Sequence, residues 1–383
     1  MATQTKKSSA SPAITIFVNV MNRPLRVIGT IFLVLLIVIA VSNIASGDYT
    51  LKTFISQLIF GLAQGSIYAL IALGYTLVYG ILFMINFAHG EVFMSGAYIG
   101  FFVIYAMEQS GFLVSNGWLA LLFTMMIGAM ASVIIAILLE RVAYRPLRRA
   151  PRLVPLITAI GASIVLQQLF LLLFGSSPRT YPAMNLFVGA GNWGCETIDG
   201  VANCPGIDLI SGRYDVSMFG EEIRLRPIFF LVMFLALVLM ACLWFFVQRT
   251  KTGKAMRAVA EDKSTAALMG INVDRVIVIT FILGAALAGA AGVLFALYNR
   301  QVTPFMGFLP GIKAFTAAVL GGIGNIPGAM FGGLLLGVIE AVLPSLLGLP
   351  NQLKDLVAFS TLVLVMIFRP TGLFGEVLSK EKA

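Results

Sequence analysis

Several runs of about twenty apolar residues, separated by short polar segments, constrain this chain more than any other feature. A transmembrane helix needs about 20 consecutive, mainly apolar residues. The chain has 383 residues, of which 59% are hydrophobic and only 11% are charged. Soluble domains carry about 25% charged residues. We therefore expect an all-α polytopic membrane protein, a helical bundle of about eight or nine spans.

The basic residues lie beside the apolar runs and set the expected orientation. The net charge of +9 does not indicate nucleic-acid binding, because cytoplasmic loops of membrane proteins are enriched in Lys and Arg. Residues 1–26 form a basic tail that we place in the cytoplasm. Residues 27–45 predict a retained, additional N-terminal span, since the run is too long for a typical signal peptide. Residues 140–152 are strongly basic and mark a cytoplasmic loop.

Polar residues interrupt one otherwise apolar stretch, residues 75–98. Asn86, His89 and Glu91 fall there together with Gly90, and His89 is the only histidine. Ionisable groups in a membrane normally face the bundle interior or a water path. One interpretation is a broken helix on the translocation pathway. The alternative is a short cytoplasmic turn with His89 and Glu91 in water.

A second interruption follows near the C-terminus. A half-length apolar segment from residue 313 breaks at residues 321–328, around Asn325, and then resumes. Two such breaks in corresponding halves of a transporter indicate a site near the midplane. We expect residues 304–311 to be an outer loop and residues 353–368 to be the last span. The prediction is thus a bundle with one or two broken helices.

Two long loops have different compositions. Residues 176–226 are rich in acids and turn residues, and we place them outside as a small ordered flap. Cys195 and Cys204 lie in this loop and would pair in an oxidising compartment; the alternative is two free thiols. Residues 248–275 form a basic loop with a helical pattern that Gly270 ends. This helix either docks on a cytosolic partner or is a solvated connector.

The sequence lacks the motifs of a self-sufficient enzyme. No phosphate-binding loop with its lysine occurs, and a single histidine supports no Ser/His/Asp arrangement. No Cys/His pattern predicts a metal site, and no cofactor is indicated. If ATP energises transport, a separate subunit must hydrolyse it.

Several polar-containing motifs carry a family resemblance. They are residues 65–80 (GSIYALIALGYTLVYG), 84–91 (MINFAHGE), 140–146 (ERVAYRP), 260–262 (AED), 268–272 (LMGIN), 314–324 (AFTAAVLGGIG) and 326–330 (IPGAM). Together they closely resemble the H-type permease of bacterial branched-chain amino-acid ABC importers. The resemblance extends over most of the chain and implies a permease domain over residues 54–375.

The resemblance also implies partners and a location. It implies a multi-pass protein of the bacterial inner membrane, in contact with lipid and not with nucleic acid. Its companions would be a second permease, two cytosolic ATPases and a periplasmic binding protein that delivers the amino acid. The residues that would contact an ATPase are Arg257, Glu261, Asp262 and Gly270. No Leu-Pro pair follows Gly270, unlike the general coupling pattern. Residues 1–45 and much of the outer loop resemble additions to the family core.

Three functional hypotheses follow. The first is a permease subunit of an ATP-driven importer for branched-chain or related amino acids, with urea or amides as alternative cargo. In it, the pathway or break residues are Asn86, His89, Gly90, Glu91 and Asn325. The second is a stand-alone ion-coupled amino-acid transporter in which His89 and Glu91 relay protons. The third is a membrane scaffold or receptor that transports nothing.

Overall fold

The computed structural model describes residues 35, 37–47, 49–147, 150–151, 153–182, 184–186, 196–198, 201–203, 207–209, 212, 214–218, 221–369 and 371–375. Within these ranges, eight helices are long and apolar enough to cross a membrane. The predicted all-helical polytopic fold is therefore confirmed. The eight are α2 (Leu51–Leu82), α3 (His89–Gln109), α5 with its continuation (Gly117–Leu147), α6 (Leu153–Phe174), α7 (Pro227–Arg249), α10 (Val273–Asn299), α12 (Ile326–Leu346) and η3 with α13 (Asn351–Phe368).

Shorter helices complete the fold. They are α4 (Phe112–Ser115), α8 (Lys251–Glu261), α9 (Lys263–Leu268) and the half-length α11 (Phe308–Gly321). The continuation of α5 consists of a π-helical turn, η1 (Glu140–Tyr144), and a 3-10 turn, η2 (Arg145–Leu147). Helical backbone also occupies residues 37–45, within the segment predicted as the additional span.

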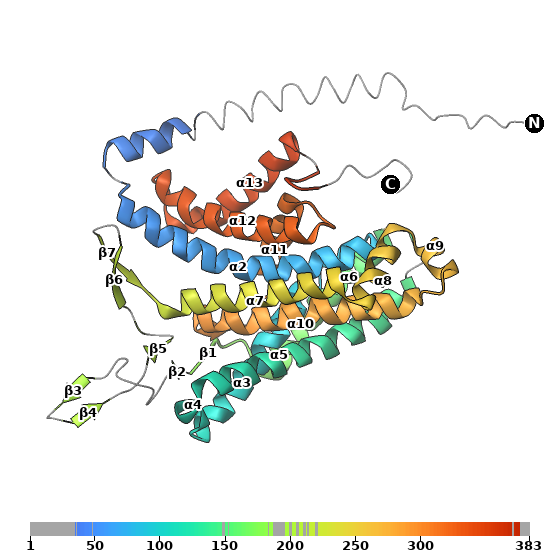
Figure 1. Ribbon diagram of the computed structural model, residues 1–383, viewed down its shortest axis with the longest axis horizontal. Coiled ribbons are helices and arrows are strands. Elements are labelled where there is room, and N and C mark those ends of the chain that lie inside the picture. The colour runs from blue at the N-terminus through green and yellow to red at the C-terminus, as the bar shows by residue number, and fades with distance from the viewer. Residues whose placement is uncertain are drawn as a thin grey trace, which may run out of the picture.

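Helix α2 lies in the middle of the bundle, between α12 on one side and α7 and α10 on the other (Figure 1). Its most extensive contact is with α12, and the two helices run antiparallel. Gly61 and Gly65 of α2 lie directly against the backbone of α12 at Gly337 and Gly333. Small residues allow such close packing between helices in a membrane, where burial of apolar surface does not drive association.

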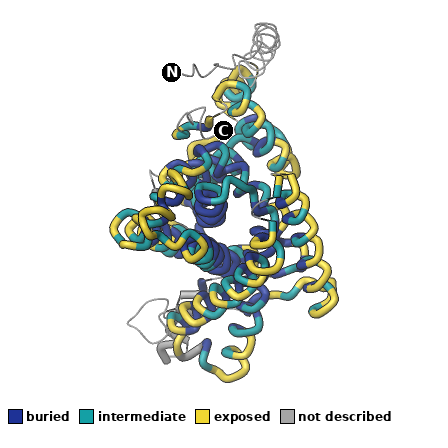
Figure 2. Tube along the Cα trace, turned by 90° about the vertical axis from the view of Figure 1, so that its right-hand side faces the viewer, coloured by how far each residue is buried: buried dark blue, intermediate teal, exposed yellow. Residues whose placement is uncertain are grey.

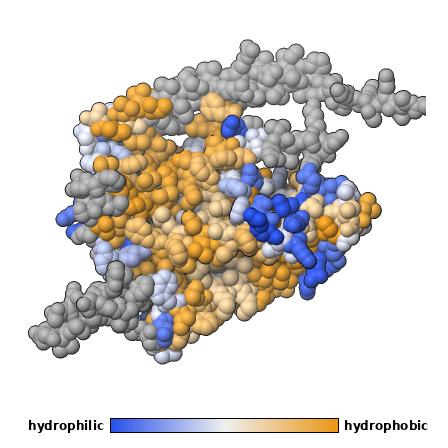
Figure 3. Space-filling view, viewed as in Figure 1, coloured by the Kyte–Doolittle hydropathy of each residue, from blue (hydrophilic) through white to orange (hydrophobic). Residues whose placement is uncertain are grey.

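The outer helices present apolar side chains to the surroundings. Figure 2 views the bundle along its axes and shows buried residues at its centre and exposed residues around it. Large exposed side chains include Met126 of α5, Val165 of α6 and Leu237 of α7. Figure 3 shows the apolar surface across the middle of the molecule, with hydrophilic residues over the end that carries α8 and α9. This is the surface that a hydrocarbon environment requires.

The junction between α2 and α3 is the first helix break. Helix α2 continues through residues 75–82 and ends at Phe83, which adopts a left-handed conformation with φ of 56°. Residues 83–88 are not helical, and α3 begins at His89. The His89 ring lies against Gly74, eight residues before the end of α2. Since a helix rises 1.5 Å per residue, α3 begins about 12 Å back inside the bundle.

The second break separates α11 from α12 at residues 322–325. Gly324 lies near Gly80 in the last turns of α2, so this break is at the end of the bundle that carries α8 and α9. The α11 segment therefore reaches the end of the bundle that carries α8 and α9, and α12 runs back from it. Residues 373–374 lie at this same end, since they bond to the end of α11.

The prediction of an outer loop at residues 304–311 is wrong. Gly307 and Gly311 lie against Gly90 at the start of α3, in the interior of the bundle. The three residues lack side chains, so the backbones of α3 and α11 meet directly there. The chain after α10 thus re-enters the protein, and α11 starts inside it.

The C-terminal residues complete the α11–α12 turn. The backbone N–H groups of Leu373 and Phe374 donate to the carbonyl oxygens of Leu320 and Gly321, at 2.8 and 3.1 Å. Asn325 donates from its side chain to the Phe374 carbonyl oxygen at 3.0 Å. Two carbonyls at the end of α11, which a helix cannot satisfy internally, are bonded in this way.

The described parts of the outer loop form short antiparallel strand pairs at the end opposite α8 and α9 (Figure 1). One pair joins β1 (Arg179–Thr180) to β8 (Gln301–Val302), which follows α10. The others are β2 (Asn185–Leu186) with β5 (Ile207–Asp208), β3 (Glu196–Ile198) with β4 (Val201–Asn203), and β6 (Tyr214–Met218) with β7 (Glu221–Leu225). Cys195 and Cys204 lie outside the described residues, so their disulfide stays a prediction.

Candidate functional site

The first turn of α3 gathers four of the predicted pathway residues in the interior. Asn86, His89, Gly90 and Glu91 are all buried, with only 3% of His89 and 1% of Glu91 exposed. The alternative of a turn with His89 and Glu91 in water is therefore wrong. The buried N-terminus of a helix carries a partial positive charge, which favours a carboxylate in its first turn.

Only one of the two carboxylate oxygens of Glu91 accepts hydrogen bonds. Its Oε1 accepts hydrogen bonds from Gln167 Nε2 at 2.7 Å and from Ser163 Oγ at 3.2 Å, both on α6. Its Oε2 has no hydrogen-bond partner and lies beside Gly307. A buried acceptor without a partner is costly, so this oxygen is suited to a ligand or a water molecule.

Asn86 and His89 are held by neighbouring aromatic residues. Asn86 Oδ1 accepts a hydrogen bond of 2.5 Å from the hydroxyl of Tyr144, which is the last residue of η1. The His89 ring packs edge-on against Tyr75, with ring centroids 4.8 Å apart. Its Nε2 has no hydrogen-bond partner. The π-helical turn is a common device at functional positions and here aims Tyr144 at the break.

Asn325 is not part of this group. Its Oδ1 accepts from the Gly328 N–H at 3.2 Å and caps the start of α12, at the end of the bundle that carries α8 and α9. The structure gives it a role in ending the second break and binding the C-terminal segment. The sequence had suggested that the two helix breaks lie together at one depth, but the structure separates them.

A second polar cluster, which the sequence did not predict, lies nearer the end of the bundle opposite α8 and α9. Lys313 Nζ of α11 is 2.6 Å from Glu340 Oε1 of α12 and 2.6 Å from Asp355 Oδ1 of α13. Gln64 Nε2 of α2 donates to Glu340 Oε1 at 3.1 Å and to the hydroxyl of Tyr68 at 2.5 Å. Lys313 and Glu340 stand alone in apolar helices, and this isolation is the signal that would have found them.

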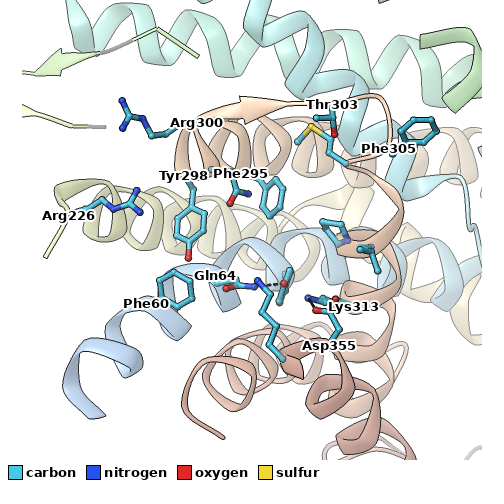
Figure 4. Close-up of a pocket in the computed structure, with 16 residues that line it drawn as sticks. Phe60, Gln64, Arg226, Phe295, Tyr298, Arg300, Thr303, Phe305, Lys313 and Asp355 are labelled. Atoms are coloured by element: carbon cyan, nitrogen blue, oxygen red, sulfur yellow. Dashed lines mark hydrogen bonds and ion pairs between the residues drawn. The ribbon is translucent and has the colours of Figure 1, made fainter. Parts of the chain in front are cut away.

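This cluster forms one wall of a cavity of about 570 Å³ (Figure 4). The cavity lies at the end of the bundle opposite α8 and α9, since residues at the start of α7, the end of α10 and the start of α13 line it. Its volume falls within the range of about 300–1,000 Å³ that is typical of small-molecule sites. The lining residues are Phe60, Gln64, Tyr68, Arg226, Phe295, Tyr298, Asn299, Arg300, Thr303, Phe305, Met306, Leu309, Pro310, Lys313, Lys354 and Asp355.

The loop between α7 and α10, predicted to be cytoplasmic, folds into two capped helices. Asp262 caps α9, because its carboxylate accepts from the N–H groups and hydroxyls of Ser264 and Thr265. These hydrogen bonds, those from Thr265 first, hold the pKa of Asp262 well below its ordinary value of 3.8. Arg257 of α8 donates to the side chain of Gln248 at 2.9 Å, which fixes the loop to the end of α7.

The tip of this loop is apolar and exposed. Gly270 follows α9 with φ of 82°, a conformation that favours glycine and ends the helix. Just before it, Leu268 and Met269 are 88% and 79% exposed. On the inner side, Met256 and Val259 of α8 are buried against the bundle. Of the predicted contact residues, Arg257 and Asp262 hold the loop together, Glu261 ends α8, and Gly270 shapes the tip.

Comparison with known proteins gives the family. A model described as branched-chain amino acid transport system / permease component matches residues 57–366. The high-affinity branched-chain amino acid transport system permease protein BraD of Pseudomonas aeruginosa is 46% identical over 328 residues, 84% of this chain and 96% of that protein. LivH of Escherichia coli (strain K12), with the same description, is 43% identical over 327 residues and has the same coverage. A probable LivH of Methanocaldococcus jannaschii is 32% identical over 148 residues, 39% of this chain and 45% of that protein.

No solved structure matches the chain. The family model begins at residue 57, after the N-terminal tail and the helical segment at residues 37–45. The match covers every helix from α3 to α12 and almost all of α13. The expected resemblance is thereby confirmed: the chain belongs to the family of permease components of branched-chain amino acid transport systems, and it is a multi-pass translocation subunit rather than an enzyme.

Proposed function

We propose that this chain moves branched-chain amino acids across the cytoplasmic membrane as one permease of an ATP-driven importer. The observation that carries the proposal is the 46% and 43% identity to BraD and LivH across 96% of each, since both are named as high-affinity branched-chain amino acid permeases. The outward-facing cavity and the capped cytoplasmic loop are the two features that such a subunit needs.

The importer would contain separate subunits for energy and for delivery. The sequence has no phosphate-binding loop of its own. Two cytosolic ATPases, a second permease and a periplasmic binding protein complete the assembly that we propose. The binding protein would dock on the outer strands, and the ATPases on the loop formed by α8 and α9.

The exposed tip of that loop is the proposed ATPase contact. Leu268 and Met269 are large apolar side chains at the end of a rigid, capped element, and exposed apolar groups of this kind mark protein interfaces. An apolar groove on the ATPase would cover them. Arg257 and Asp262 act there by keeping the loop rigid.

The loop also contacts the α2–α3 break. Lys263 Nζ lies 5.7 Å from the centre of the Phe83 ring, which is the residue that ends α2. A movement of α9 toward or away from the membrane would thus act on the segment that leads to Asn86, His89 and Glu91. We expect this route to open and close the interior part of the pathway in alternating access.

The first test is purification of the tagged chain from native membranes in mild detergent, with mass spectrometry of the proteins that accompany it. Recovery of two ATPases and a second multi-pass permease is expected. The recovered complex is then reconstituted with the cognate binding protein, and uptake of radiolabelled leucine, isoleucine and valine is measured with and without ATP.

Two results would contradict the proposal. One is recovery of the chain alone from membranes in which other ABC complexes survive; an uptake assay driven by an ion gradient would then replace the ATP assay. The other is ATP-driven uptake of urea or an amide with no uptake of branched-chain amino acids, which would keep the permease role and change the cargo.

A further inference from the structure

The Lys313 cluster contains an arrangement of charges that the proposed function does not use. Lys313 and Glu340 are buried, with side-chain exposures of 6% and 1%, whereas Asp355 has a side-chain exposure of 38% and lines the cavity. One ammonium group is therefore placed between two carboxylates, one inside the protein and one at the cavity wall. A lone lysine in a membrane needs a single partner for neutrality, so the second carboxylate is in excess.

The two contacts of Lys313 are not equivalent. The contact with Glu340 is both an ion pair and a hydrogen bond of 2.6 Å. The contact with Asp355 has the same length, but Asp355 Oδ1 makes no hydrogen bond. Glu340 thus holds Lys313 in place, and Asp355 is the partner that a competing group can replace.

The cavity beside this cluster has a polar side and an apolar side. Figure 4 shows Lys313, Asp355 and Gln64 on one side and the rings of Phe295 and Tyr298 on the other, with the Phe60 ring beside Gln64. Besides Asp355 Oδ1, two buried oxygens at the site have no hydrogen-bond partner, Glu340 Oε2 and the Tyr298 hydroxyl. Buried polar groups are normally paired, so these two indicate a ligand or water that completes the site.

We infer that the polar wall of this cavity binds the ammonium and carboxylate groups of an α-amino acid between Asp355 and Lys313, with the amino acid's apolar side chain against the opposite aromatic wall. The inference deepens the proposed function and rests on it. It assigns to the permease a binding site of its own for the cargo, in addition to the site on the binding protein.

At the Lys313–Asp355 pair itself, charge balance favours this occupant over a simple anion or cation; Arg226, Arg300 and Lys354 also line the cavity and add positive charge around it. An inserted zwitterion produces the order Glu340, Lys313, carboxylate, ammonium, Asp355, in which each charge is next to an opposite one. The ion pair between Lys313 and Asp355 is replaced by two ion pairs, one from Lys313 to the carboxylate and one from Asp355 to the ammonium. The net charge of the site does not change. An anion would face Asp355 and a cation would face Lys313, and a like charge at close range opposes binding.

The apolar side fits a hydrophobic amino acid. Phe60, Phe295, Met306 and Leu309 supply apolar surface to the cavity, which Arg226 and Arg300 also line. A polar side chain against the apolar surface would lose its hydrogen bonds to water, which costs binding free energy. The site therefore recognises amino acids by their shared backbone charges and favours those with apolar side chains.

The test is direct binding of radiolabelled leucine to the purified importer complex in nanodiscs, without the binding protein. The competitors are unlabelled leucine, leucine methyl ester, which lacks the carboxylate, and 4-methylpentanoate, which lacks the ammonium. Each analogue should compete about tenfold to a hundredfold more weakly than leucine, because each loses one charge-assisted hydrogen bond.

The decisive variant is Asp355→Asn, at a partly exposed position where the loss of charge leaves no buried group unpaired. It should weaken leucine binding by about tenfold to a hundredfold and strengthen 4-methylpentanoate binding, because the anion no longer faces a like charge, so that the preference for leucine disappears. Glu108→Gln, which removes an exposed carboxylate at the end of α3, is the control and should change neither affinity.

The outcomes separate this inference from the proposed function. Absence of ATP-driven leucine uptake by the wild-type complex would reject the proposed function. Normal uptake together with no measurable leucine binding, or with an Asp355→Asn variant that keeps the preference for leucine over 4-methylpentanoate, would overturn the inference alone. Equal weakening of both ligands would also overturn it, since it would show a general disturbance of the cavity.

Discussion

His89 occupies the space that a β-carbon on Gly74 would need. A methyl group at residue 74 would overlap the imidazole ring at Nε2 and Cε1. Gly74 of α2 thus provides the space in which the first turn of α3 packs. The start of α3 is fixed by this contact between the two helices rather than by a side-chain cap. This makes the position of the helix break depend on residue 74.

Gly74→Ala should displace His89 and reduce leucine uptake strongly, because overpacking in a buried contact typically costs about 1–3 kcal/mol. Thermal unfolding of the purified complex and uptake in proteoliposomes measure the two effects. Gly80→Ala is the matched control in the same helix, since a β-carbon there meets only Gly324 Cα at 3.8 Å. An uptake rate for Gly74→Ala equal to that of Gly80→Ala would show that the contact has no functional role.

Glu91→Ala should slow uptake by roughly tenfold, which corresponds to about 1.4 kcal/mol, because Ser163 and Gln167 lose their shared acceptor. The affinity of the binding protein for its amino acid should not change. Glu91→Gln keeps an acceptor but removes the charge, so its uptake rate separates the two contributions. Normal uptake by Glu91→Ala at equal expression would remove Glu91 from the mechanism.

Leu268→Ser should weaken the stimulation of ATP hydrolysis by the loaded binding protein, because it removes exposed apolar surface from the tip of the cytoplasmic loop. We expect basal ATP hydrolysis to change less. Ala267→Ser, at an exposed neighbouring position of the same helix, is the control. Full stimulation in Leu268→Ser would place the ATPase contact elsewhere on the loop.

Asp262 should act as a helix cap and not as a pH sensor. A carboxyl whose pKa is lowered on folding stabilises the fold above its unfolded pKa, and this contribution disappears only as the pH falls toward the lowered value. Coupled ATP hydrolysis in wild type and in Asp262→Ser, which caps without titrating, should therefore have the same pH dependence from about pH 5 to 8.

A matched variant checks the cap itself. Asp262→Ala removes the acceptor for the N–H groups of Ser264 and Thr265 and should reduce coupling, whereas Asp262→Ser should retain it. Equal coupling in the two variants would show that α9 does not need its cap.

The predicted disulfide has a simple assay. Cys195 and Cys204 should resist alkylation in the intact protein and react after reduction, as measured by the mass of tryptic peptides. Cys242 of α7 is a free thiol and provides an internal reference for a reduced cysteine. Alkylation of both loop cysteines without a reductant would show that they are free.

The spans and the first break were predictable because they depend on local composition. Apolar runs define α5, α6, α7 and α10, and Asn86, His89 and Glu91 signal the break by standing in one such run. The depth of that break was not predictable. It depends on Gly74 and on the contact of Gly90 with Gly307 and Gly311, residues more than 200 positions apart in the sequence.

The Lys313 cluster was missed for a related reason. Lys313, Glu340 and Asp355 come from three different helices, and a single isolated charge in an apolar helix does not show which partner it has. Only the re-entry of α11 into the bundle brings them together. Residues 304–311 looked like a loop because Pro and Gly are frequent in turns, whereas here the glycines serve contact between backbones.

The backbone hydrogen bonds between residues 373–374 and the end of α11 join segments that are synthesised at different times. Leu320 and Gly321 are made about fifty residues before Leu373 and Phe374. Their carbonyl oxygens can receive these partners only after α12 and α13 have been made. The turn between α11 and α12 is thus closed by residues that follow the last spanning helix the structure describes. A polypeptide that stops after a complete α13 but before residue 373 would retain open acceptors at the end of α11.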